Sequence, residues 1–419
     1  MPRLGVLRSV DDIPAAEWAE IAQQADIDLS RGFLQFREYL EPGPSALLTI
    51  RTAGRLRGAL HGVMSVQESG LTSDPWKFIT AEAVLRLEGD EDTVEAARLR
   101  RVQRDLVCAA AGEHADGDTP LWRVLTRAFG PCFVVREFDR SELLFHPETS
   151  PAEAERLAEQ LIRGAQAMVL DNGSGVVTFP FVSPRDGLLR QTLAEAGFRG
   201  GTMTGASWID TQGCDSYQEF LARLPTRRRR RYRLEEQELL QAPDMRAAEV
   251  DLLENAERVA ALETQTMIKY GGQPDPEDIR RARVALAGML PDAVRLCAVE
   301  RRGQIIACAL HLQGHKSVLC LTYGCDYGVP DRSMSYPWAV FYHPVRMAIT
   351  AGAGALRLGL EGFEAKTIRA AVVEARELWV WTPDSAALGR LGEVLDLVDA
   401  RNTGYLARFP GAKGDVTRS

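Results

Sequence analysis

The chain has 419 residues, so two domains are expected, each large enough to bury its own hydrophobic core. Charged residues make up 26% of it and hydrophobic residues 45%, as in ordinary globular proteins, which excludes a largely disordered chain. The formal net charge of -8 excludes a surface that attracts nucleic acid all over, so any anionic partner must be bound at a local basic site.

The chain has no run of roughly 18 consecutive apolar residues, the length that a membrane span requires. We therefore expect a cytoplasmic protein without membrane spans. The seven cysteines are an odd number and include no Cys-x-x-Cys pair, so we expect neither a disulfide framework nor a zinc ribbon. Most basic residues are arginines, so a lysine in a candidate motif is stronger evidence for a functional role than an arginine is.

The first half of the chain predicts a layered α/β domain. Ala46–Ser65 is expected to form an edge hairpin that turns at Ala53-Gly54. The elements expected after it are a charged helix near Glu88–Arg104, an acidic loop over Gly112–Asp118, a strand over Phe133–Arg136, a helix over Pro151–Ala167, a strand over Val176–Phe181, a helix over Gly187–Ala196 and a strand over Thr202–Ile209. This order is like the βαβ alternation of layered α/β proteins.

The pattern breaks at Thr211–Asp215, where we place the boundary between two lobes, residues 1–212 and 213–419. The second lobe is expected to contain helices over Tyr217–Leu224, from Thr226 onward, over Leu252–Met267 and over Asp275–Leu290, three consecutive strands over Ala293–Glu300, Gln304–Gln313 and Ser317–Tyr323, a helix over Tyr336–Ala351, strands over Leu356–Leu360 and Leu378–Trp381, and a last helix over Ser385–Asp399.

A run of five arginines follows Thr226, which is expected to be the N-cap of its helix. Cations oppose the helix dipole at this end and repel one another, and a bound anion would offset both effects. Two interpretations stay open. The arginines form a solvated face relieved by pairs such as Arg231 with Glu235, or they contact phosphates of a large substrate or RNA. The candidate phosphate-binding residues are Arg227, Arg228, Arg230 and Arg231.

Lys366 and Arg369 lie in the segment Gly359–Arg369, which follows a strand, and α/β sites usually open at such strand ends. Their spacing can place two cations on one face, where they would hold an anion or stabilise an oxyanion that forms on an acyl carbonyl. The alternative is a surface lysine and arginine paired with Glu361 or Glu364.

The loop from Tyr323 to Trp338 is dense in aromatic and hydroxyl groups. It can line a pocket, with Asp326 as a proton acceptor and Tyr323, Tyr327 or Tyr336 as donors. Its aromatic side chains could equally serve packing alone.

These features resemble, in their order along the chain, the FemAB-like and related GNAT-type acyltransferases, over roughly Tyr217–Phe409. The resemblance implies tandem GNAT-like lobes, each a mixed central sheet flanked by helices. It also implies N-acyl transfer, with amide-bond formation on an amine acceptor, in cell-wall or secondary-metabolite biosynthesis. Lys366 falls at the family's lysine near the acyl carbonyl, Arg369 at the arginine beside it, and Arg228–Arg231 in its basic segment.

The resemblance implies no metal or other cofactor and an activated acyl carrier as co-substrate. No Gln/Arg-x-x-Gly-x-Gly/Ala turn, the pyrophosphate cradle of enzymes that use coenzyme A, is found, so aminoacyl-tRNA is favoured and acyl-CoA is the alternative. Ala370-Ala371 stands where relatives commonly have a glycine, which puts the local backbone geometry in question. His311 and His315 lack a nearby third ligand and are expected to be structural. A non-catalytic binding module for an anionic partner stays open, and the sequence does not give the oligomeric state.

Overall fold

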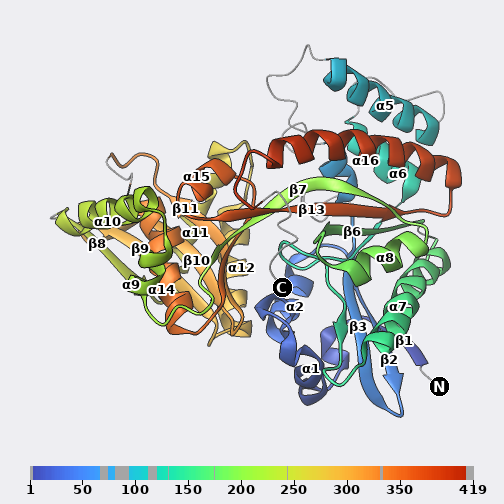
Figure 1. Cartoon of the computed structure of the whole chain (residues 1–419), viewed down its shortest axis with the longest axis horizontal. Coiled ribbons are helices and arrows are strands. Elements are labelled where there is room, and N and C mark those ends of the chain that lie inside the picture. Colours follow the sequence, from blue (N-terminus) through green and yellow to red (C-terminus); the bar gives the residue numbers. More distant parts are fainter. Residues whose placement is uncertain are drawn as a thin grey trace.

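Figure 1 shows the computed structural model of the chain, which describes residues 3–66, 74–80, 94–111, 120–130, 132–173, 175–242, 244–330 and 334–411. Two lobes lie side by side, and the long strands β7 and β13 run from one lobe into the other. None of the described helices combines the length and the apolar character needed to cross a membrane.

The elements of the first half are β1 (Arg3–Leu7), α1 (Ala15–Ile21), α2 (Arg31–Leu40), β2 (Ser45–Thr52), β3 (Arg55–Met64), α3 (Pro75–Thr80), α5 (Val94–Ala111), α6 (Leu121–Phe129), β4 (Cys132–Val134), β5 (Leu144–Phe145), α7 (Pro151–Asp171), β6 (Val176–Val182), α8 (Gly187–Glu195) and β7 (Arg199–Asp210), with short 3-10 turns at Val10–Asp12, Ala22–Gln24 and Ile27–Leu29. The expected acidic loop Gly112–Asp118 and residues 88–93 of the expected charged helix lie outside the described residues.

The elements of the second half are α9 (Tyr217–Arg223), α10 (Thr226–Gln241), β8 (Met245–Val250), α11 (Leu252–Lys269), α12 (Pro276–Met289), β9 (Val294–Arg301), β10 (Gln304–Gln313), β11 (Ser317–Cys325), α13 (Ser335–Pro337), the π-helix η5 (Trp338–Tyr342), α14 (His343–Thr350), β12 (Ala355–Leu360), α15 (Phe363–Thr367), β13 (Val372–Trp381) and α16 (Ser385–Leu406).

One continuous sheet passes through both lobes in the order β1-β2-β3-β4-β6-β13-β7-β12-β11-β10-β9-β8, and β5 pairs with β3 beside this path. The β2–β3 hairpin forms as predicted, but its expected place at the sheet edge is wrong. The outer neighbour of β2 is β1, which pairs antiparallel with it, Leu4 opposite Ile50. The sequence therefore located the hairpin and missed the strand that covers its edge.

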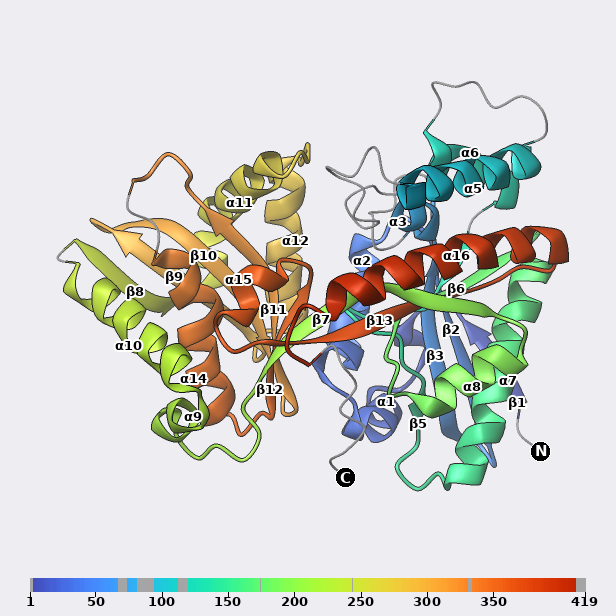
Figure 2. The ribbon, with the colours of Figure 1, turned by 45° about the horizontal axis from the view of Figure 1, so that its top comes forward.

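The last two elements of the chain return to the first lobe. Strand β13 lies between β6 and β7 and pairs antiparallel with both, while α16 packs along β7 and α5. Figure 2 shows α16 with α5 and α6 on one side of these strands and α7 and α8 on the other. Whether residues 1–212 and 213–419 fold as separate domains stays a prediction.

Both lobes contain the same unit of a strand, a helical connection and a parallel strand. Strand β4 pairs parallel with β6 across α7, and β11 pairs parallel with β12 across α13–α14. The second strand of each unit has a register shift near a residue in the left-handed region, Phe181 in β6 (φ 69°) and Gly359 in β12 (φ 69°). This correspondence confirms the predicted α/β class, and a single mixed sheet flanked by helices serves both lobes.

Helix α2 of the first half joins the two lobes. Its Phe33 and Phe36 pack in the same hydrophobic core as Leu262 of α11 and Leu286 of α12, on one face of the second lobe's sheet. Residues from α9, α10 and α14 fill the core on the other face. The lobes therefore share apolar packing as well as strands.

Candidate functional site

Lys366 lies in α15, shortly after the end of β12, and its side chain is buried. Its Nζ donates to the carbonyl oxygens of Leu358 (2.8 Å), Gly359 (3.4 Å) and Leu360 (2.9 Å). Three acceptors match the three N–H groups of an ammonium. Burial lowers the pKa of Lys366 to about 8. Its proposed role at an acyl carbonyl stays a prediction, and in this structure it holds the strand end together.

The backbone around Lys366 is strained. Glu361 (φ 55°) and Ala370 (φ 73°) occupy the left-handed region that favours glycine, and Gly362 (φ 66°) also lies there. Such a conformation costs a non-glycine residue roughly 1–2 kcal/mol. The alanine at position 370 therefore adopts the backbone of a glycine, and its surroundings enforce it. Strain of this kind gathers at ligand-binding and catalytic sites.

Arg369 connects this segment to α10. Its Nε and Nη2 donate to the two carboxylate oxygens of Glu235, each at 3.1 Å, and its Nη1 donates to the Ala365 carbonyl at 3.1 Å. The Tyr232 hydroxyl donates to the Arg369 carbonyl at 2.8 Å. Like Lys366, Arg369 has protein acceptors for its polar groups, and its role in catalysis stays a prediction.

The structure brings Tyr323 and Tyr336 close to Arg369. The two tyrosine rings meet edge to face at 4.9 Å, and Phe341 lies 5.4 Å from the Tyr336 ring and 5.4 Å from the Arg369 guanidinium. The Tyr323 hydroxyl is 3.2 Å from the Ser335 hydroxyl. Burial raises the pKa of both tyrosines, so their hydroxyls stay protonated and can donate hydrogen bonds at neutral pH.

Asp326 and Tyr327 lie beside α11. The Asp326 carboxylate accepts from Arg258 at 3.2 Å and from the Gly328 backbone N–H at 3.0 Å. The Lys269 ammonium lies 4.2 Å from the Tyr327 ring centre. A proton-accepting role for Asp326 stays a prediction.

The arginine run occupies the first turns of α10, with one correction. The helix begins at Thr226 itself, and its N-cap is Pro225, which makes no side-chain capping bond. Arg231 pairs with Glu235 at 3.2 Å, as in the solvated-face interpretation. Within the described part of the chain, Arg227–Arg230 form no ion pair or side-chain hydrogen bond, and Arg227 and Arg230 are exposed.

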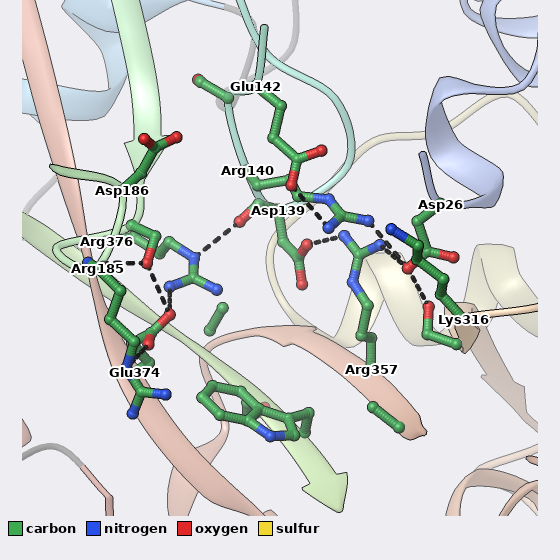
Figure 3. Close-up of a pocket in the computed structure, with 17 residues that line it drawn as sticks. Asp26, Asp139, Arg140, Glu142, Arg185, Asp186, Lys316, Arg357, Glu374 and Arg376 are labelled. Atoms are coloured by element: carbon green, nitrogen blue, oxygen red, sulfur yellow. Dashed lines mark hydrogen bonds and ion pairs between the residues drawn. The ribbon is translucent and has the colours of Figure 1, made fainter. Parts of the chain in front are cut away.

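A cavity of about 540 Å³ opens at the junction of the two lobes (Figure 3). Five acidic and five basic side chains line it, so its wall is charged but balanced. The lining residues are Asp26, Asp139, Arg140, Ser141, Glu142, Ser183, Arg185, Asp186, Ala206, Ser207, Trp208, Lys316, Ser317, Ala355, Arg357, Glu374 and Arg376. They come from widely separated segments, and none of them was among the sequence-predicted site residues.

Arg357 of β12 is the centre of the ion-pair network on one wall of this cavity. It pairs with Asp26 at 3.3 Å, with Asp28 at 2.7 Å and with Asp139. Arg140 also binds Asp26 (3.0 Å) and Asp28 (2.8 Å). Burial alone would raise the pKa of Asp28, but Arg140 and Arg357 outweigh it and hold this pKa well below its usual range. The network joins the lobes through charges that are buried together.

A second ion-pair group lies on the opposite wall in Figure 3. Glu374 accepts from Arg376, from Arg185 at 2.7 Å and from the Ser183 hydroxyl at 3.2 Å. The Arg376 Nε donates to the Asp139 carbonyl at 3.1 Å. Arg185 has a side chain that is 64% exposed, so it can exchange its partner for an incoming anion.

The loop between β4 and β5 separates this larger cavity from a smaller one of about 370 Å³. Asp139 and Arg140 line the larger cavity, whereas Glu137 and Phe138 line the smaller one. Burial raises the pKa of Glu137 to about 8, although Arg37 lies 3.4 Å away. This carboxyl group is therefore largely protonated at neutral pH.

The burial of Glu137 makes a testable contribution to stability. The folded state keeps the proton up to about pH 8, whereas the unfolded chain releases it near pH 4.3. The free energy of unfolding of the wild type, relative to Glu137→Gln, is therefore expected to fall as pH rises between these values, by at most about 1.4 kcal/mol per pH unit. Urea unfolding of both proteins from pH 5 to 8 measures this difference, and a constant difference would contradict the assignment.

His311 is buried, with its Nε2 donating to the Ala339 carbonyl at 2.9 Å, and burial lowers its pKa to about 4. This contact gives His311 a structural partner within the core. In the described ranges, His, Cys, Asp and Glu side chains form no group of three or more that could hold a metal ion.

Comparisons with known proteins show which fold and family the chain resembles. A sequence model of the FemAB-like family, described as peptidoglycan biosynthesis/recognition, matches residues 141–384, more than half of the chain. The solved structure of FemX is 10% identical, covers 90% of this chain and 96% of its own, and superposes with a TM-score of 0.56. No curated protein sequence matches the chain.

Two further solved structures resemble the chain over most of its length. A conserved protein of unknown function from Bacteroides thetaiotaomicron is 11% identical, with coverage of 88% of this chain and 98% of its own and a TM-score of 0.51. A tandem GNAT protein from the clavulanic acid biosynthesis pathway is 12% identical, with 91% and 98% coverage and a TM-score of 0.47.

Proposed function

Because the chain belongs to the FemAB-like family, we propose that it is an N-acyltransferase that moves an aminoacyl or acyl group from an activated carrier to an amine acceptor. Aminoacyl-tRNA is the proposed carrier, and no metal or bound cofactor takes part. The observation that carries the choice of carrier is the first turn of α10, where Arg227–Arg230 have no ion-pair partner among the described residues. A polyanionic backbone would neutralise these charges.

Two further features of the second lobe support RNA as the carrier. Tyr270 is 77% exposed, with the Lys269 ammonium 5.6 Å from its ring centre. Exposed aromatic rings beside cations bind single-stranded bases by stacking. Arg231 and Arg369 share Glu235, so the basic turn is linked directly to the segment that holds Lys366.

The proposed reaction is the attack of a neutral amine on the ester carbonyl of the carrier. The new nitrogen–carbon bond forms, the carbon–oxygen bond to the carrier breaks, and the proton lost by nitrogen goes to the released carrier oxygen. Protonated Tyr323 and Tyr336 can donate hydrogen bonds to the developing oxyanion. The larger cavity, with balanced charges from both lobes, suits a polar acceptor that carries charge of its own.

Acyl-CoA is the alternative carrier. The N-terminus of α7, in the first lobe, is poorly suited to bind the pyrophosphate of coenzyme A. In that lobe, α7 connects the two parallel strands, and a pyrophosphate would need free backbone N–H groups at its N-terminus. The Ser150 hydroxyl already accepts from the Glu153 N–H, and Pro151 has no N–H to offer. RNase treatment separates the carriers, because only tRNA-dependent transfer is lost.

Changing Arg227–Arg230 together to glutamine is expected to weaken binding of aminoacyl-tRNA and to reduce the slope of log K against log salt concentration by about 3. Arg280→Gln with Arg281→Gln is the control, since these arginines of α12 have side chains that are 41% and 57% exposed and already pair with acids of their own helix. Filter binding between 50 and 200 mM salt measures both slopes. An unchanged slope in the fourfold variant would show that the run does not contact phosphates.

A non-catalytic binding module is the second candidate, favoured by one observation. Lys366 donates to three backbone carbonyls, and Arg369 donates to Glu235 and Ala365. Neither cation offers an obvious free donor to a reacting carbonyl in this conformation. If no aminoacyl-tRNA or acyl-CoA mixture supports transfer by the wild type while binding of tRNA persists, the module is the correct function.

A further inference from the structure

The smaller cavity lies at the lobe junction, on the far side of the β4–β5 loop from the charged cavity. It has a volume of about 370 Å³ and is formed by α2, this loop, α12, β11 and the end of β12. Its lining residues are Phe33, Phe36, Arg37, Leu40, Glu41, Arg136, Glu137, Phe138, Arg283, Leu321, Thr322 and Leu360. Half of them are apolar, and three of these are phenylalanines.

Most of the charged side chains of this wall are paired, but the Glu137 Oε1 has no hydrogen-bond partner among the described residues. Arg37 and Arg136 both bind Glu41, at 3.2 and 3.3 Å. Arg283 makes a bidentate pair with Glu263, with its shortest contact at 2.6 Å. The surface that this wall offers to a ligand is mainly apolar, and it includes five ionisable side chains against ten around the larger cavity.

The cavity adjoins the segment that carries Lys366. Leu360 lines it, and the carbonyl of the same residue accepts from the Lys366 Nζ at 2.9 Å. Gly359 lies against the Phe138 ring so closely that a Cβ would be 3.1 Å from it. A group held near Lys366 could thus extend an apolar substituent into the cavity.

We propose that the smaller cavity binds an apolar substituent of the transferred group, of about leucine to phenylalanine size. The substituent is either an amino-acid side chain or a short acyl chain. An apolar cavity of about 150 Å³ is enough to bind benzene, so this volume accommodates either. Transfer of this group rests on the proposed function, whereas binding of an apolar group in the cavity does not.

Binding of small uncharged probes tests this assignment without any carrier. N-acetyl-L-leucinamide, N-acetyl-L-phenylalaninamide and hexanamide serve as apolar probes, and N-acetylglycinamide is the reference. By calorimetry or ligand-observed NMR, at least one apolar probe is expected to bind ten times more tightly than the reference, or better, because burial of such a side chain is favourable. Tighter binding of the amino-acid amides identifies an aminoacyl group, and tighter binding of hexanamide an acyl chain.

A pair of leucine variants locates the binding. Leu40 lines the cavity and is 45% exposed, so Leu40→Asn is expected to fold and to lower the affinity of the apolar probes about threefold or more. Leu170 on α7 is 50% exposed and does not line the cavity, so Leu170→Asn should leave the affinity within twofold. Equal binding of all probes, or equal effects of the two substitutions, would overturn the proposal.

Failure of the proposed function gives a different result. Probe binding that depends on Leu40, with no transfer from any donor, would reject the acyltransferase and retain the cavity as an apolar ligand site. Transfer that proceeds equally well with alanyl, leucyl and aspartyl donors would retain the acyltransferase and reject the role of the cavity.

Discussion

Arg357→Met is expected to lower the free energy of unfolding by about 3–5 kcal/mol. Arg357 is 8% exposed and neutralises Asp26, Asp28 and Asp139, all of which are buried. Methionine fills much of the same volume but leaves Arg140 as the one remaining cation bound to Asp26 and Asp28. Burial of carboxylates without enough counter-charge costs free energy, so the substitution is expected to destabilise the contact between the lobes.

Urea unfolding at pH 7 measures this change, and two further variants test its cause. Arg55→Met removes an exposed pair with Glu20 and should change stability little. Asp28→Asn combined with Arg357→Met should recover part of the loss, because it removes one of the uncompensated charges. If the double variant is as unstable as the sum of both single variants, the network is not the source of the effect.

Lys366→Met is expected to have the second large effect, on stability and on transfer together. The substitution removes the Lys366 donor from the carbonyls of Leu358 and Leu360, and orphaned polar groups of this kind cost about 1–3 kcal/mol each. The Gly359 carbonyl keeps its hydrogen bond from the Ser207 hydroxyl at 2.9 Å. If Lys366 also stabilises the oxyanion, turnover should fall about 100-fold or more.

The pH profile separates these two roles of Lys366. Its pKa of about 8 means that the wild-type residue loses its charge above that pH. An oxyanion-stabilising lysine should therefore give a turnover that declines as pH rises through about 8, while the protein stays folded by circular dichroism. A turnover that stays level between pH 7 and 9.5 would leave Lys366 with the structural role alone.

The periodic elements of the fold could be predicted from the sequence, and elements defined by tertiary contacts could not. The expected strand Val176–Phe181 and helix Pro151–Ala167 match β6 and α7, because hydrophobic periodicity and caps are local signals. The expected strand Leu378–Trp381 is only the end of β13, which begins at Val372. The first half of β13 contains Glu374 and Arg376. Their charges interrupt the apolar pattern that predicts a strand, but in the folded chain the two side chains form an ion pair on the cavity wall.

The short helices of the first 40 residues could not be predicted from the sequence, because the hydrophobic residues that they pack against lie far along the chain. Phe33 and Phe36 of α2 pack against the core of the second lobe. The candidate site divides in the same way. Tyr323 and Tyr336 lie in one short segment and Lys366 and Arg369 in another, and each segment was found by its local motif. Asp28 and Arg357 meet only in the folded chain. No local signal joins residues at such a separation.

The insertion of β13 has a consequence for biosynthesis. Residues 199–210 of β7 leave the ribosome long before residues 372–381, which pair with them in the centre of the sheet. Until then the edges of β6 and β7 remain open, and open edges invite association with other chains. We expect nascent chains that stop before Val372 to be retained by chaperones or to aggregate. The order in which this chain is made differs from the order in which its sheet can close.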